Sequence, residues 1–178
     1  MDAEFAAALA EWHDFFAAVA GAAATLVGLL FVALALNPAS MDDDGSVGVR
    51  VWSGQTFHSF LVVLAVALVT LIPDETGRAL AITLAILGGQ GVVRVGGDLR
   101  QARADPDPTW RSRQALMRFA APTAAYVCCL WAAAEAWRGD EDAFGWLVAA
   151  TFLLVVSASA SCWDLLKAIG GRPPSPGA

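Results

Sequence analysis

Long uncharged stretches alternate with short polar ones along this chain of 178 residues. The first long stretch, residues 15–36, contains no ionisable side chain. About twenty such residues are enough for a helix to cross the ~30 Å hydrocarbon core of a bilayer. Four further apolar stretches follow it. The pattern predicts an all-α, polytopic transmembrane helix bundle with five spans, at about residues 14–36, 56–73, 79–98, 117–137 and 143–166.

The composition agrees with a membrane protein that has one domain. Only 16% of the residues are charged, whereas soluble domains carry about 25%. The spans leave no room for a separate soluble domain, so we expect one membrane domain over residues 1–178, with a disordered C-terminal tail at 168–178. A cleaved signal peptide is not expected, because the first turns are acidic and the apolar run exceeds the ~7–15 residues of a signal sequence.

The charges of the loops predict an orientation. The connection between the third and fourth spans is the most basic one, and cytoplasmic loops carry an excess of Lys and Arg. Its arginines are Arg100, Arg103, Arg111, Arg113 and Arg118. Alternation then places the N-terminus outside and the C-terminus in the cytoplasm. The acids at 42–44 fall on the cytoplasmic side and are discordant, but acids count weakly in this rule.

Small residues follow one face of the first span. We call this set the small-residue stripe. Its first member is an acid, and its members are Asp14, Ala18, Gly21, Thr25 and Gly28. Spacings of four and three keep these positions on one helix face. Helices associate in lipid by close van der Waals approach, which small side chains permit. Two interpretations stay open: the stripe packs on another helix, within the monomer or between protomers, or it lines a narrow pore with Asp14 at its outer mouth.

The same stretch, "WHDFFAAVAGAAATLVGLLFVALALN", resembles the first helix of a group of small, uncharacterised bacterial multi-span membrane proteins. The likeness covers mainly residues 11–38. Matching positions are Trp12, His13, Asp14, Phe15, Phe16, Gly28, Leu29, Leu30, Phe31, Val32 and Asn37. The group often has Ser where this chain has Ala35. The resemblance implies a bacterial inner-membrane protein and implies no particular activity.

Polar residues from several spans are expected at one depth near the cytoplasmic side. In the third span, Gln90, Arg94 and Asp98 recur every four residues and share a helix face, so that Arg94 and Asp98 can pair. We call the whole set the inner polar layer: Asn37, His58, Gln90, Arg94, Asp98, Ser161 and Asp164. Two interpretations of Arg94 stay open. It is a buried partner of these acids, or a cation that extends to the lipid headgroups.

Acidic residues gather at the other side of the predicted membrane. Glu11, His13 and Glu135, together with Asp14, are expected to form an outer acidic mouth. Acidic side chains at the entrance of a pathway raise the local concentration of cations.

Two functions agree with these features. The first is a homo-oligomeric, channel-like or transporter-like protein that contacts the lipid bilayer and passes ions or small solutes. The alternative is a non-conducting accessory or regulatory subunit of a larger membrane complex.

Enzymatic and nucleic-acid functions are not expected. The chain has no HExxH or CxxC motif and no Ser-His-Asp order, so we predict no catalytic residues, no metal and no cofactor. Its three cysteines, Cys128, Cys129 and Cys162, lack metal-ligand spacing. The net charge of −6 disfavours binding to nucleic acid.

Overall fold

The computed structural model describes the backbone of residues 2–36, 47–73, 76–104 and 113–170. It describes side chains within residues 5–33, 35–36, 54–73, 76–100 and 119–163. The helices are α1 (Asp2–Leu36), α2 (Val47–Thr70), α3 (Gly77–Ala104), α4 (Arg113–Arg138) and α5 (Asp142–Gly170). The predicted all-α bundle is therefore confirmed.

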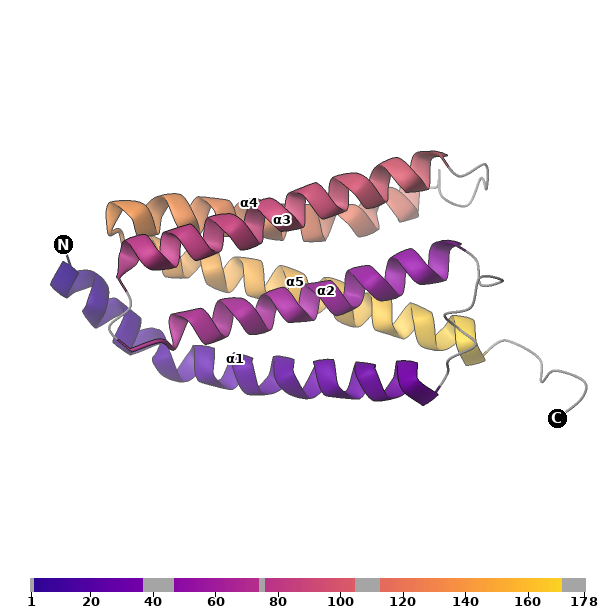
Figure 1. Cartoon of the computed structure of the whole chain (residues 1–178), viewed down its shortest axis with the longest axis horizontal. Coiled ribbons are helices and arrows are strands. Elements are labelled where there is room, and N and C mark those ends of the chain that lie inside the picture. Colours follow the sequence, from indigo (N-terminus) through magenta and orange to yellow (C-terminus); the bar gives the residue numbers. More distant parts are fainter. Residues whose placement is uncertain (1, 37–46, 74–75, 105–112, 171–178) are drawn as a thin grey trace, which may run out of the picture.

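The helices run lengthwise in one elongated bundle, and each packs antiparallel to its neighbours (Figure 1). Their order in space differs from their order in the sequence: α1, α2, α5, α4, α3. A smaller contact between α2 and α3 closes the last four helices into a bundle, and α1 lies on the outside against α2. Because α5 lies between α2 and α4, its side chains meet both of these helices in the interior.

The helices fit a membrane by length and composition. Four stretches are long and apolar enough to cross one: Phe5–Ala33, Gly77–Arg100, Phe119–Arg138 and Asp142–Trp163. The fifth helix, α2, contains the shorter apolar segment Gly54–Thr70. It joins the end of α1 to the start of α3, so it traverses the same thickness as they do. The chain is thus a multi-pass bundle with apolar surfaces that suit contact with lipid.

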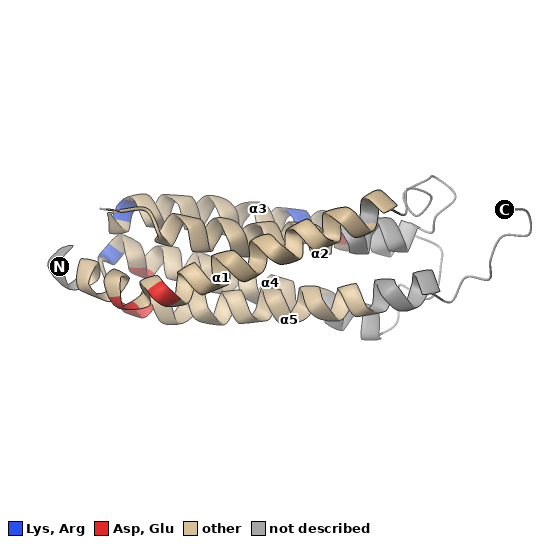
Figure 2. Cartoon of the chain, turned by 90° about the horizontal axis from the view of Figure 1, so that it is seen from below, with Lys and Arg blue, Asp and Glu red and all other residues tan. Residues whose placement is uncertain are grey.

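Most charged residues of the described part gather at the end where α1 begins (Figure 2), whereas Arg94, Asp98 and Arg100 lie in the later half of α3. We call the end where α1 begins the acidic end; its acids include Glu11, Asp14, Glu135, Asp140 and Asp142. Helix α1 extends back to Asp2, well before the predicted span. The reason is that Glu11, His13 and Asp14 lie on the exposed side of the helix while Phe5 is buried, so these charges do not end it.

Two glycines of α3 set its distance from α4. A Cβ at Gly91 would overlap the ring of Tyr126, and a Cβ at Gly88 would lie 3.0 Å from the side chain of Leu130. Gly91 admits only a hydrogen atom, and a Cβ at Gly88 would require Leu130 to shift slightly. The absence of side chains at both positions lets the two backbones approach closely. Gly89, Gly96 and Gly97 have no atom within 4 Å of such a Cβ. Only part of the glycine-rich segment therefore serves helix packing.

The turn between α4 and α5 ends one helix and begins the next. Gly139 has a φ of 74°, in the left-handed region that glycine tolerates at a helix end. Its N–H donates to the carbonyl of Ala136 (3.1 Å), and the N–H of Asp140 donates to that of Glu135 (3.0 Å). The carboxylate of Asp140 then accepts from the N–H of Asp142 (3.1 Å). This turn fixes α5 antiparallel to α4.

Candidate functional site

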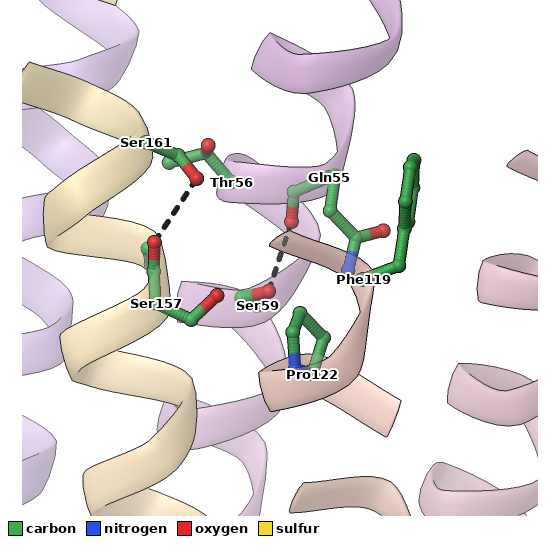
Figure 3. A pocket seen from close by; sticks show the side chains of 8 residues that line it. Gln55, Thr56, Ser59, Phe119, Pro122, Ser157 and Ser161 are labelled. Atoms are coloured by element: carbon green, nitrogen blue, oxygen red, sulfur yellow. Dashed lines mark hydrogen bonds between the residues drawn. The ribbon is translucent and has the colours of Figure 1, made fainter. Parts of the chain in front are cut away.

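A small polar pocket lies inside the bundle, between α2, α4 and α5 (Figure 3). Its lining residues are Gln55, Thr56, Ser59, Phe119, Pro122, Ser157, Ala158 and Ser161. The space inside is about 20 Å³. A cavity of at least ~10–15 Å³ on this measure holds one water molecule. The pocket therefore accommodates one water-sized particle.

Two serine hydroxyls of the pocket donate their protons in hydrogen bonds within their own helices. Ser59 Oγ donates to the carbonyl of Gln55 and Ser161 Oγ donates to the carbonyl of Ser157, each at 3.0 Å (Figure 3). A hydroxyl has one proton and two lone pairs. Toward the cavity these serines consequently present lone pairs, which attract a hydrogen-bond donor or a cation.

The amide of Gln55 has no hydrogen-bond partner among the described residues. Both Oε1 and Nε2 are buried without one. Buried polar groups in folded proteins are nearly always hydrogen-bonded, and leaving one unsatisfied is costly. A particle in the pocket that bonds to Gln55 would remove this cost.

Pro122 and Phe119 form the α4 wall of the pocket, and the helix continues through the proline. Pro122 lies within α4 and is almost fully buried. Because proline has no N–H, the carbonyl four residues earlier, at Arg118, loses its helical partner. In membrane proteins such freed backbone groups are tolerated where neighbouring helices, hydroxyl side chains or water satisfy them.

A second polar feature lies on the outside of the bundle, between α2 and α3. It is an open groove of about 400 Å³ lined by His58, Gly89, Gln90, Val93 and Arg94. We call it the α2–α3 groove. Gln90 and Arg94 are exposed along it. The guanidinium of Arg94 extends toward α2, where a Cβ at Gly54 would lie 3.4 Å from its Nη2.

The predicted pairing of Arg94 with Asp98 does not occur. The ion pairs found among the described residues do not include Arg94, and Asp98 Oδ2 is buried without a hydrogen-bond partner there. His58 Nε2 and Tyr126 Oη share this condition. The rings of His58 and Tyr126 lie 6.3 Å apart.

The described residues of the inner polar layer are divided between these two places, except Asp98, which lines neither. His58, Gln90 and Arg94 line the α2–α3 groove, whereas Ser161 lines the pocket on the other side of α2. Asn37 and the side chain of Asp164 lie outside the described residues. The residues that the sequence grouped into one layer therefore lie in two separate places, an exposed groove and an internal pocket.

The small-residue stripe of α1 faces away from the other helices. Ala18, Gly21, Thr25 and Gly28 are all exposed, and so is Asp14. No atom lies within 4 Å of a Cβ at Gly21 or Gly28. The packing face of α1 is instead formed by Phe5, Ala8, Phe16, Ala20 and Ala23. The interpretation that the stripe packs within the monomer is therefore wrong, and packing between protomers stays a prediction.

The residues of the outer acidic mouth all lie at the acidic end but do not converge on either described pocket. Glu11, His13 and Asp14 are exposed on α1, with His13 Nδ1 3.5 Å from Asp14 Oδ1. Glu135 forms an ion pair with Arg138 of the same helix at 3.0 Å. The carboxylate of Glu135 is thereby neutralised locally.

Sequence reasoning missed most of the pocket. Gln55, Thr56 and Ser59 stand in the same segment as His58, and Pro122 is a proline inside an apolar helix, which is a recognisable signal. No group of three His, Cys, Asp or Glu side chains that would suit a metal exists within the described ranges. Comparisons with protein families, with curated proteins and with solved structures find no match for this chain.

Proposed function

We propose that this multi-pass protein provides a channel-like or transporter-like pathway for ions or small solutes. The pocket between α2, α4 and α5 is the observation that carries the proposal. Ser and Thr are ordinary at helix contacts in membranes, but the buried amide of Gln55 has no partner among the described residues, which is unusual and supports a polar pathway. Pro122 lies within α4 beside this pocket and removes one helical hydrogen bond there.

The chemistry of the pocket supports a narrow class of solutes. Its polar lining is neutral, and hydroxyl and amide oxygens are ligands that hard cations accept. Its space of about 20 Å³ admits a single ion or a water molecule in this conformation. A larger solute would require the helices to separate, and Pro122 gives α4 a position at which to bend.

The orientation and location of the protein form part of the proposal. We place the acidic end outside and the basic connection after α3 in the cytoplasm, in a bacterial inner membrane. Acids on the outside would then concentrate cations near the pathway.

The pathway is tested by obstructing the pocket. We expect Ser157→Leu to reduce ion flux into liposomes severalfold, because the added side chain exceeds the free space. Flux is measured with the purified protein in vesicles, across Na⁺, K⁺ and proton gradients. Ser159→Leu is the matched control: it is exposed on the same helix and should leave flux unchanged. Normal flux through correctly folded Ser157→Leu would refute the pathway.

Homo-oligomer formation is tested at Gly28. We expect Gly28→Leu to lower the oligomeric fraction in detergent without lowering the melting temperature of the monomer, since the site is open and leucine favours helix more than glycine does. Size-exclusion chromatography with light scattering measures the fraction. Gly145→Leu is the control, at another open position. If both variants assemble like the wild type, the stripe contacts lipid.

The exposed stripe also favours the second candidate, a non-conducting accessory subunit. A face of small residues with no neighbour in the monomer suits close docking on a helix of another membrane protein. Wild-type protein that produces no flux above that of empty liposomes, with any of the salts, would favour this candidate.

A further inference from the structure

The α2–α3 groove places polar groups where lipid would surround the bundle. Val93 is 76% exposed, and Gln90 and Arg94 beside it are exposed too. A charged side chain against acyl chains is unfavourable unless a polar partner accompanies it. His58 also lines the groove, although its Nε2 is buried and is not itself exposed to a ligand there. The groove therefore requires a polar ligand.

The depth of the groove indicates which ligand is available. The guanidinium of Arg94 lies beside Gly54 of α2, and Arg94 stands within about two turns of the polar end of α3, where Asp98 and Arg100 follow. The positive charge consequently lies at the border between hydrocarbon and headgroups. Lipid phosphates are found at this level.

We propose that the α2–α3 groove binds the phosphate of an anionic phospholipid. The planar guanidinium of Arg94 suits two phosphate oxygens at once, and the amide of Gln90 can donate to a third. Gly89 adds no side chain to the groove, and a Cβ there would meet no atom within 4 Å. Basic pockets between transmembrane helices bind anionic headgroups in this way.

The rest of α3 provides a track for the acyl chains. Ile82, Ile86, Gln90 and Arg94 follow each other every four residues and so share one face. Ile82 and Ile86 are 53% and 55% exposed. From Arg94 they lead toward the middle of the bundle, which is the direction that acyl chains take from a headgroup. A free phosphate ion would make no use of this apolar track.

The test measures the thermal stability of delipidated protein in dodecyl maltoside. Dioleoyl-phosphatidylglycerol should raise the melting temperature more than dioleoyl-phosphatidylcholine, whose headgroup has no net charge. Arg94→Gln should weaken the apparent affinity for phosphatidylglycerol about fivefold, as expected for one cation near an anionic headgroup. Arg78→Gln removes the same charge at the acidic end, where Arg78 stacks on Trp137 at 5.9 Å, and should bind like the wild type.

A second variant keeps the test decisive if Arg94→Gln does not fold. Gly89→Leu fills the groove without changing any charge, and it should also weaken the effect of phosphatidylglycerol. Equal stabilisation by both lipids, or wild-type affinity in Gly89→Leu, would overturn the proposal. Inorganic phosphate that alone produces the full shift would identify a soluble anion site and would overturn it as well. None of these outcomes depends on flux, so the lipid site stands or fails independently of the pathway.

Discussion

We expect Gly91→Ala to destabilise the bundle by about 3 kcal/mol, near the upper end of the usual cost of overpacking a core. The new Cβ would overlap the ring of Tyr126, which is fully buried and has no room to withdraw. Helices α3 and α4 would have to move apart along their shared interface. Thermal melting in detergent micelles measures the loss.

Gly89→Ala is the control for this prediction, because it makes the same change two residues away at an open position. It should be neutral or stabilising, since alanine favours helix over glycine by about 0.5–1 kcal/mol. Gly91→Ala should also cost less in a Tyr126→Leu background, where the ring is absent. Equal effects of the two alanine substitutions in the wild-type background would show that α3 and α4 do not pack through Gly91.

Phe144→Ala should destabilise the protein by about 3 kcal/mol, the low end of the range for a buried phenylalanine. Phe144 is fully buried, and its ring lies 5.2 Å from that of Phe5. We expect the low end of this range because lipid is as apolar as the protein core, so the hydrophobic contribution to stability is small. The loss then comes from the van der Waals contacts missing around the new cavity. The same contact holds the start of α1 against α5.

Phe152→Ala provides the comparison on the same helix. Phe152 is 58% exposed, so its removal leaves no enclosed cavity and should change the melting temperature little. Phe5→Ala should destabilise like Phe144→Ala, and the double variant should cost less than the sum, since both changes break one contact. Additive losses would mean that the two rings act separately.

The number and approximate extent of the helices were readable from the sequence, because long uncharged runs alternate with short polar ones. The packing face of α1 was not readable. Beyond Asp14 this helix is uncharged on all sides, so periodicity offers two candidate faces, Gly21 with Gly28 or Ala20 with Ala23. Only the position of α2 decides between them, and it places Ala20 and Ala23 inside.

The sequence predicted Arg94 and Ser161 as members of one group, whereas the structure separates them between the α2–α3 groove and the internal pocket. Counting along each span gives the height of Arg94 and Ser161, yet not the direction in which each side chain points. That direction depends on which helices are neighbours. Because α5 inserts beside α2, Ser161 meets Gln55 and Ser59, while Arg94 is left on the outer side of α2.

The central place of α5 has a consequence for biogenesis. Chains enter the membrane from the N-terminal side as the ribosome makes them, so α1 to α4 are inserted before α5 exists. Before α5 is inserted, α2 and α4 lack the helix that lies between them. Thr56 and Ser59 of α2 then lack the α5 serines that line the same pocket. Assembly of the interior therefore waits for the last helix to leave the translocon.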